Sequence, residues 1–297
     1  MKIKINHFLL LVLIFSWVPT LMLLEQIRSR SFLKVYFLSV GQGDAALLKY
    51  QGKNIVIDGG DRPHKGQPDF LKTIQAFGVD HIDLMVLSHA HADHLYGLVQ
   101  SLKTLRVTTI LEPGLKHKTE LYALFQKLAK QHHVVVKKPE EGMTIRIGPL
   151  FMIDILSPLQ GFSETDLNNN SLVLNVHYAK HHLLFTGDIE TPAEKVLVAE
   201  KSERLKADIL KVPHHCSKTS SSFAFLKAVN PKVAVISLAK QNMYGFPHEA
   251  AFKRIEKQTG KIYRTDRDGN IQFIFNRERS VSRTHYNHQW WRFWESK

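Results

Sequence analysis

Three histidines and one aspartate stand within six residues of the segment VLSHAHADHLYGL. They are His89, His91, Asp93 and His94, and they follow the apolar run Ile82–Leu87, which has the length of a buried strand. In an extended segment, residues two positions apart point to the same side, so His89 and His91 can bind one metal ion. Asp93 and His94 then turn toward a second ion. The pattern predicts a metal centre where a strand ends.

Two further apolar runs end in metal-binding residue types. LLFTGD places Asp188 directly after a predicted strand, where the turn at Gly187 exposes a carboxylate able to bridge two ions. DILKVPHHCS places His214 and His215 at another strand end, with Pro213 fixing the exit of the chain. Sites in open sheets gather where strands terminate, so these ends are predicted to meet at one site.

The elements that must position these residues begin at Phe32, with short apolar stretches bounded by glycine and aspartate. Strands are predicted at LKVYFLSV, DAALLKY, NIVIDGG, RVTTILEP, VVVKK, TIRIG, LFMIDILSP, SLVLNVHYA, HHLLFTGD, ADILKVPHH, PKVAVISL and KIYRTDRDGNIQFIF. Helices are predicted over 69–77, 118–132, 191–200, 221–228 and 250–259, with another beginning near Leu95. Two sheets with helices outside, an α/β architecture, accommodate this mixture.

The amino-terminal segment has a different character. Phe8 to Leu24 is a run of 17 residues without a charge, at the short limit for a membrane-spanning helix and the long limit for a signal-peptide core. No small-residue cleavage site follows, which favours an uncleaved anchor. Basic residues flank the run on both sides and leave its orientation open under the positive-inside rule. Because short basic amino-terminal flanks generally stay inside, we expect a single-pass protein of the cell membrane with its catalytic domain outside the cytoplasm.

The sequence divides into three parts: a membrane anchor or signal at 1–30, a domain that carries the predicted metal centre at 31–280 and a tail at 281–297. The tail interleaves arginines with tryptophans, a composition that suits single-stranded bases, a membrane interface or docking onto the domain. The formal charge of +13 and pI near 9.7 favour polyanionic partners such as nucleic acids, anionic lipids or wall polymers. The single cysteine, Cys216, excludes an internal disulfide.

Several separated motifs resemble the metallo-β-lactamase superfamily, and more narrowly the hydrolase domain of ComEC-type DNA-uptake proteins. They are SVGQGDAALL, IVIDGG, LSHAHADHLYGL, LLFTGDIE, ADILKVPHHCSKTSSS, VAVIS, NMYGFPHE and YRTDRDGNI, in this order. The resemblance runs from about Val35 to Phe275. It implies an αββα sandwich with two divalent metal ions, zinc or manganese, at one sheet edge.

The resemblance also implies which residues bind the two ions. The expected ligands are His89, His91 and Asp188 for the first ion, and Asp93, His94, Asp188 and His215 for the second. Asp188 is then the bridge, and Asp58 in IVIDGG supports the metal loop by fixing ligand orientation.

Three positions depart from the family pattern. Many members have a further histidine where this chain reads NNNSLVL, so the first metal site is expected to be weak and completed by water. Cys216 stands where glycine usually follows the paired histidines, and is expected to be a small bystander. Phe246 in YGFPHE replaces a frequent histidine, whereas His248 remains. His177, His181 and His182 are interpreted as solvated histidines outside the site.

Two divalent cations sharing a water lower its pKa toward neutrality and stabilise charge on the oxygens of an electrophile such as a phosphodiester. In that chemistry Asp93 could orient the attacking water. His214 or His248 could bind the phosphate or protonate the leaving oxygen. The segment SKTSSSF, residues 217–223, could present further donors to phosphate.

The leading hypothesis is a membrane-anchored metal-dependent hydrolase, a phosphodiesterase or nuclease acting on DNA and related to DNA uptake. Its expected partners are DNA or another phosphodiester, the membrane and the DNA-uptake machinery. Two alternatives stay open. One is hydrolysis of another anionic ester, such as a choline phosphodiester or a lactone. The other is a non-catalytic DNA-binding accessory, which predicts salt-sensitive binding without turnover.

Overall fold

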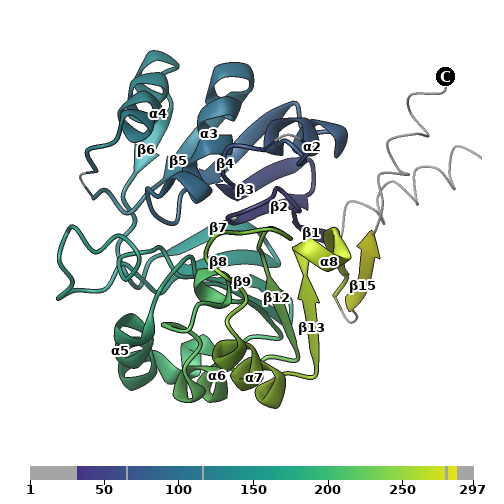
Figure 1. Cartoon of the computed structure of the whole chain (residues 1–297). Coiled ribbons are helices and arrows are strands. Elements are labelled where there is room, and N and C mark those ends of the chain that lie inside the picture. The colour runs from purple at the N-terminus through teal and green to yellow at the C-terminus, as the bar shows by residue number, and fades with distance from the viewer. Residues whose placement is uncertain (1–31, 65, 116, 278–279, 286–297) are drawn as a thin grey trace, which may run out of the picture.

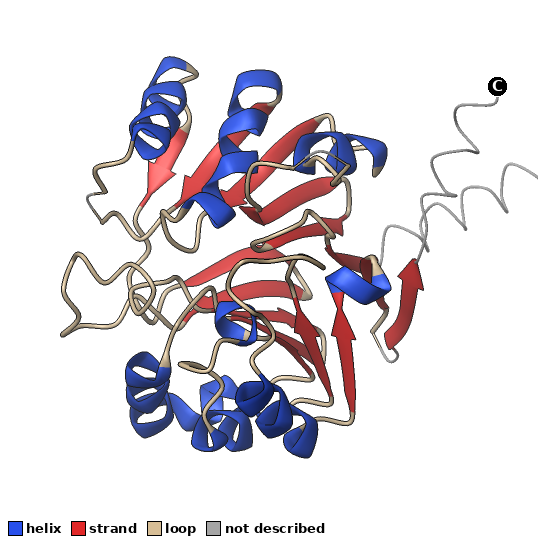
Figure 2. Ribbon diagram, in the orientation of Figure 1, coloured by secondary structure: helices blue, strands red, loops and turns tan. Residues whose placement is uncertain are grey.

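The computed structural model describes residues 32–64, 66–115 and 117–277, together with the backbone of 280–285. Within these ranges two β-sheets pack face to face and helices cover both outer faces, so the architecture is the predicted αββα sandwich (Figures 1 and 2). The anchor predicted within Phe8 to Leu24 lies outside the described residues. Across the described ranges, no helix has both the length and the apolar character that crossing a membrane requires.

The first sheet has eight strands in the order β15-β14-β1-β2-β3-β4-β5-β6. Their bounds are β1 Leu33–Phe37, β2 Ala45–Tyr50, β3 Lys53–Gly59, β4 His81–Val86, β5 Arg106–Leu111, β6 Val135–Lys137, β14 Asn270–Phe275 and β15 Ser280–His285. Strands β3 to β6 run parallel to one another, and the other pairs, including β2 with β3, are antiparallel. Strand β15 overlaps the start of the segment 281–297 that the sequence sets apart as a tail.

The second sheet has seven strands in the order β13-β12-β11-β10-β9-β8-β7. Their bounds are β7 Thr144–Gly148, β8 Phe151–Ile155, β9 Leu174–Tyr178, β10 His181–Phe185, β11 Ile209–Lys211, β12 Val233–Ile236 and β13 Lys261–Arg264. Strands β10 to β13 are parallel. Each sheet therefore contains a parallel half whose strand ends share one edge, the arrangement that gathers functional loops.

The helices form two outer layers. Above the first sheet in Figure 1 lie α2 Phe70–Ala76, α3 Ala92–Thr104 and α4 Glu120–Gln131, and below the second lie α5 Thr191–Lys201, α6 Phe223–Val229 and α7 Glu249–Gln258. A short turn of helix, α8 Thr265–Asp268, connects β13 to β14. Polar side chains cap three helices: Asp69 accepts from Lys72 N, Thr119 from Tyr122 N and Ser222 from Phe225 N.

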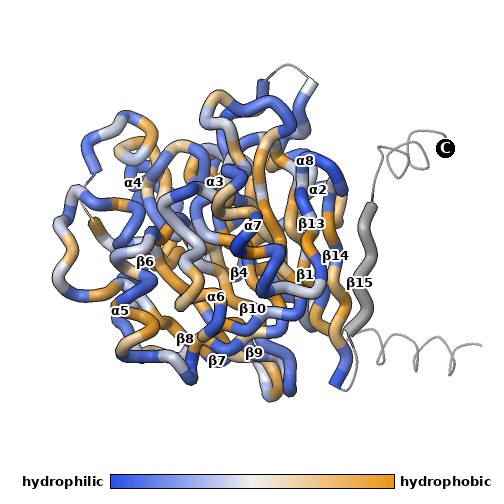
Figure 3. Tube along the Cα trace, turned by 60° about the horizontal axis from the view of Figure 1, so that its bottom comes forward, coloured by the Kyte–Doolittle hydropathy of each residue, from blue (hydrophilic) through white to orange (hydrophobic). Residues whose placement is uncertain are grey.

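Three apolar clusters hold these layers together. One fills the space between the sheets, and the other two lie between each sheet and its helices. Figure 3 shows the corresponding hydrophobic colour along the inner strands and hydrophilic colour on the outer loops. Burial of this apolar surface is the main favourable term that fixes the positions of the strand ends.

Helix α3 begins earlier than the sequence predicts. It starts at Ala92 with His91 as its N-cap in extended conformation, whereas the expected start was near Leu95. Asp93 and His94 therefore lie in the first helical turn and not in a loop. A carboxylate in the first turn is stabilised by the positive end of the helix dipole, which accounts for the earlier start.

Gly97 of α3 sits where helix and sheet approach most closely. A Cβ atom there would lie 2.1 Å from the carbonyl oxygen of Gly59 at the end of β3 and 2.6 Å from the ring of Phe70. Only a residue without a side chain allows this approach, which brings the start of α3 onto the end of β3.

Replacement Gly97→Ala is expected to lower the free energy of unfolding by about 2 kcal/mol, because overpacking outweighs the better helix propensity of alanine. Urea denaturation followed by circular dichroism measures this change. Lys103→Ala on the same helix, at an exposed position, is the matched control and should alter stability by less than about 0.5 kcal/mol. Equal stability of both variants would contradict the close approach.

Candidate metal centre

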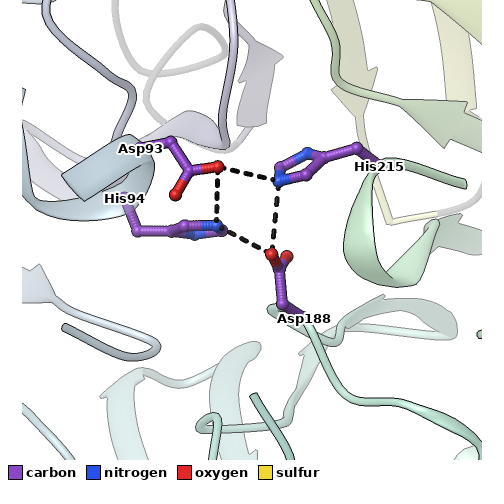
Figure 4. A group of neighbouring side chains, drawn as sticks. All are labelled: Asp93, His94, Asp188 and His215. Atoms are coloured by element: carbon purple, nitrogen blue, oxygen red, sulfur yellow. Dashed lines mark ion pairs between the residues drawn. The ribbon is translucent and has the colours of Figure 1, made fainter. Parts of the chain in front are cut away.

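Ligand groups from both sheets meet at the shared edge. Asp93 and His94 lie in the first turn of α3, which follows β4, whereas Asp188 follows β10 and His215 follows β11. Figure 4 shows the four side chains converging from these separate elements. One ligand atom of each lies within 4.8 Å of the others, and all but Asp93 are buried. The structure therefore brings together the four residues predicted to bind the second ion.

The spacing of these atoms suits a single cation. Oδ2 of Asp188 lies 3.3 Å from Nε2 of His94 and 3.3 Å from Nε2 of His215. Oδ2 of Asp93 lies 3.3 Å from Nε2 of His215 and 3.9 Å from Nε2 of His94. Ligands about 2.1 Å from a tetrahedral ion are about 3.4 Å from one another. The four groups thus have the chemistry and spacing of a site for a divalent cation.

Unsatisfied polar atoms point to the same conclusion. Among the described residues, Nε2 of His94, Nε2 of His215 and Oδ1 of Asp188 are buried and make no hydrogen bond. Buried polar atoms without partners cost free energy, and an ion bound through Oδ2 of Asp188 would satisfy the two imidazole nitrogens. The residues present therefore fit the metal that the sequence predicts.

The first predicted site is less complete. Nε2 of His89 lies 4.0 Å from Oδ2 of Asp188, but it also contacts Nδ1 of His91 at 2.9 Å, so the two rings share a hydrogen bond. The ring of His117, which the sequence analysis did not single out, lies 6.3 Å from that of His91. An ion here would have to replace the bond between His89 and His91, as expected of a weaker site.

Asp58 lies behind the predicted ligand His94. It lies at the end of β3, where Oδ2 contacts Nδ1 of His94 at 2.9 Å and Oδ1 accepts the backbone N–H of Ser88 at 2.7 Å. This leaves Nε2 of His94 directed at Asp188. A carboxylate behind a metal-binding imidazole fixes its orientation and makes it more basic.

Nδ1 of His215 donates to the carbonyl oxygen of Ser237 at 2.9 Å, and a carboxylate that was not predicted from the sequence, Asp44, lies close by. Its Oδ1 lies 3.3 Å from Nδ1 of His215, while Oδ2 forms a buried ion pair with Nζ of Lys211 at 2.5 Å. The backbone N–H of Asp44 also bonds the carbonyl of Asp93, an approach that requires Gly43 at φ +100°. Two signals could have found this pair: an acid after GQG, and a lysine within the apolar strand ILKV.

Electrostatics separate the histidines into two groups. Burial lowers the pKa values of His94 and His215, but Asp188 and the other carboxylates beside them outweigh burial and raise these pKa values well above normal. Burial and the neighbouring His94 lower the pKa of His89 well below normal. Without metal, protons on His94 and His215 therefore compensate the buried carboxylates.

His214 lies beside the metal-binding group and not within it. Its Nε2 is 3.9 Å from Oδ2 of Asp188, and its Nδ1 is 3.1 Å from Oε1 of Glu190. Glu190, which follows Asp188 in the motif TGDIE, also accepts a hydrogen bond from Thr219 and was not identified from the sequence. His214 is thus oriented by one carboxylate while its other nitrogen faces the centre.

His248 is separated from the ligands by an aromatic ring. Its Nδ1 accepts the backbone N–H of Lys218, and the ring of Phe246 lies between it and His215, 5.1 Å from the first and 5.9 Å from the second. The described structure shows no direct contact of His248 with the metal-binding group, so its predicted catalytic role stays a prediction.

The remaining residues of the segment after His215 serve the fold. Burial raises the pKa of the Cys216 thiol to about 12, so the thiol stays protonated at neutral pH. The backbone donors of Ser221 and Ser222 bond the buried carboxylate of Glu194. These two N–H groups, expected to face phosphate, are already satisfied within the protein.

The other histidines lie away from the site. His181 and His182 begin β10 and pair with the end of β9, at the opposite end of the strand from Asp188. His177 contacts Asp154 at 3.1 Å, and His181 packs against Phe275. They take no part in the metal centre, although His181 is buried and not solvated as expected.

The geometry agrees with comparison to known proteins. The sequence model of the metallo-beta-lactamase superfamily matches residues 38–240 of this chain. The chain belongs to this superfamily. Igni18, a metallo hydrolase of the archaeon Ignicoccus hospitalis, has the same fold with a TM-score of 0.50 and 15% identity, covering 86% of this chain and 100% of that one. CmlA, a diiron beta-hydroxylase of Streptomyces venezuelae, has the same fold with a TM-score of 0.51 and 12% sequence identity. The similarity covers 85% of this chain and 54% of CmlA.

Curated relatives carry names connected with competence and recombination. Recombination protein 2 of Haemophilus influenzae is 30% identical over 263 residues, which cover 88% of this chain and 31% of that protein. Competence protein ComA of Neisseria gonorrhoeae is 31% identical over 238 residues, covering 80% and 31%. ComE operon protein 3 of Bacillus subtilis is 28% identical over 259 residues, covering 82% and 33%. The chain spans about a third of these relatives. Family and ligand cluster together support a metal-dependent hydrolase.

Asp58→Asn is expected to weaken metal binding by about 10- to 100-fold, because the amide no longer fixes the proton and orientation of His94. Titration of the metal-free full chain with zinc, followed calorimetrically, measures this loss. Asp80→Asn, an exposed carboxylate just before β4 at the end away from the site, is the control and should bind like the wild type. Unchanged affinity in Asp58→Asn would contradict the orienting contact.

Zinc binding near pH 7 is expected to release about two protons, one each from His94 and His215, because both imidazoles must lose a proton to bind metal. The raised pKa values give the sign: apparent affinity falls as pH falls. In the metal-free protein, His94 and His215 stabilise the folded state fully at pH values below the pKa of unfolded histidine. This stabilisation is lost as the pH rises through their raised pKa values in the folded state. Calorimetric titration in buffers of different ionisation enthalpy gives the number of protons released. If no proton is released, His94 and His215 are not protonated in the metal-free protein.

Proposed function

We propose that this chain is a metal-dependent phosphodiesterase, a nuclease that acts on DNA in connection with DNA uptake. The observation that carries the proposal is the cluster of Asp93, His94, Asp188 and His215, with the spacing of a divalent cation site. The names of the curated relatives favour DNA as substrate, and the formal charge of +13 raises the local concentration of a polyanion.

Two divalent cations, zinc or manganese, would be held by the six predicted ligands and would supply Lewis acidity toward a phosphoryl oxygen and toward water. The chain's own residues orient the reactants. Asp93 is the most exposed of the four clustered groups, with 22% of its side chain accessible, so it can accept a hydrogen bond from an attacking water and orient it. Its pKa is held low by His94 and His215 despite burial, which keeps the carboxylate ready to accept a hydrogen bond.

His214 is the proposed proton donor to the leaving oxygen. Its side chain is 20% exposed at the rim of the centre, and Glu190 on Nδ1 leaves Nε2 facing the position of a substrate. The backbone of His214 is in the left-handed region at φ +49°, so the turn holds this ring toward Asp188 against the usual conformational preference. The imidazole of His214 thus lies between Asp188, a predicted metal ligand, and Glu190, the carboxylate that orients it.

The apolar run from Phe8 to Leu24 is the proposed membrane anchor, supported by its length and lack of charge. With the short basic flank inside, the hydrolase domain lies outside the cytoplasm. A DNA strand brought to the cell surface would meet the active site there.

His91→Ala and Asp188→Ala are each expected to reduce cleavage of single- or double-stranded DNA by the full chain at least 100-fold with manganese or zinc added, because each removes an expected ligand. Release of acid-soluble nucleotides measures the rate. His132→Ala, an exposed histidine at the end of α4, is the matched control and should retain activity. Cleavage that survives both ligand substitutions would exclude this centre as its source.

A second candidate function is a DNA-binding accessory whose metal is structural. The observation in its favour is the contact between His89 and His91, which leaves one preformed site where catalysis by the superfamily uses two ions. Elemental analysis separates the candidates, since the accessory holds about one metal per chain and binds DNA without turnover.

A further inference from the structure

A short loop before α7 places two stacked aromatic rings beside the metal centre. The rings of Tyr244 and Phe246 lie 5.4 Å apart and within 19° of parallel. The ring of Phe246 in turn lies 5.8 Å from that of His214 and 5.9 Å from that of His215. The stack therefore extends outward from one metal ligand and from the proposed proton donor.

The loop that carries the rings is fixed from both ends. The side chain of Asn242 accepts the backbone N–H of Phe246 and donates to the carbonyl of the same residue, which closes the loop on itself. The backbone N–H of His248 bonds the carbonyl of Cys216, next to the ligand His215. The rings are thus held relative to the centre before any ligand arrives, which reduces the entropy lost on binding.

The outer part of the stack is open to solvent. Tyr244 is 53% exposed, although its ring is large and apolar, while Phe246 is partly buried against the second sheet's helices. The two segments that meet here carry exposed lysines, Lys218 after the paired histidines and Lys240 before the loop. An open aromatic face on segments that carry exposed lysines suits a ligand that is both planar and anionic.

We propose that Tyr244 and Phe246 form a stacking subsite for the nucleobase next to the phosphodiester held at the metal centre, in a single-stranded nucleic acid. The inference rests on the proposed phosphodiesterase function and adds the form of its substrate. The ring of Phe246 touches the rings of two centre residues, so a phosphate at the centre places its adjacent base on the stack. A paired base has both faces covered in the duplex, whereas an unpaired base offers a free face.

The charge of the surroundings separates this ligand from another that aromatic rings bind. A choline ester would present a quaternary ammonium group to the same rings. Lys218 and Lys240, on the two segments that meet at this loop, add positive charge, which disfavours a cation and favours the phosphates of a strand. The observations therefore favour a base over choline.

The test is binding of two labelled oligomers to the zinc-loaded full chain, measured by rapid mixing before hydrolysis proceeds. One oligomer is a strand of twelve thymidines, and the other has the same sugar-phosphate backbone with every base absent. Both carry equal charge, so the difference in their affinities reports base contacts alone. Tyr244→Ala is expected to weaken binding of the thymidine strand about tenfold and to leave the abasic strand unchanged.

Tyr244→Phe keeps the ring and should retain wild-type affinity for both strands. Met243→Ala, 89% exposed on the same loop, is the matched control and should change neither. Equal weakening of both strands by Tyr244→Ala, or no weakening of either, would overturn the subsite. Displacement of the thymidine strand by millimolar glycerophosphocholine would overturn it in favour of a choline site.

The subsite and the proposed nuclease can fail separately. Ring-dependent binding of thymidines in a protein that does not hydrolyse DNA would remove the nuclease and leave the subsite. Loss of hydrolysis in Asp188→Ala, together with unchanged thymidine binding in Tyr244→Ala, would support the nuclease and remove the subsite.

Discussion

One buried carboxylate oxygen is the constraint on which the site depends. Oδ2 of Asp188 lies within 4.0 Å of nitrogens from four histidines, His89, His94, His214 and His215. A buried anion is stable only where cations or donors compensate it, and here they come from both sheets. The ends of β4, β10 and β11 must therefore meet at one point, and the two sheets cannot slide without exposing an uncompensated charge.

A buried carboxylate lies near Nδ1 of each of the two clustered histidines. His94 is backed by Asp58 from the end of β3, and His215 is backed by Asp44 from the turn between β1 and β2. Both acids belong to the first sheet, yet Asp44 holds a ligand and a lysine of the second. Asp58 thus orients His94, whereas His215 is oriented by the carbonyl of Ser237. Asp44 connects the layers through its ion pairs with His215 and Lys211, so alignment of the ligands and packing of the sandwich depend on each other.

The two-sheet fold and most of the clustered residues could be predicted from the sequence, because the strand ends that carry these residues have a strong local pattern. An apolar run followed by HAHADH, TGD or PHH predicts both a buried strand and a ligand-bearing turn, and the order of strands and helices gave the two-sheet fold. Asp44 and Lys211 escaped because their partnership spans more than 160 residues, and an acid after glycine is usually a turn former. Glu190 escaped for a similar reason: only the fold shows that it faces His214. The start of α3 was misplaced because helix propensity says little about a histidine N-cap.

The paired histidines belong to a turn with an unusual backbone. His214, His215 and Cys216 have φ values of +49°, +51° and +68°, three successive residues in a conformation that side chains disfavour by about 1 kcal/mol or more each. Such a turn persists only where its surroundings impose it, as β11, the cap of α6 and the loop before α7 do here. The turn consequently presets His215 with its Nε2 facing Asp93 and Asp188, so the polypeptide already holds this ligand in place before an ion binds.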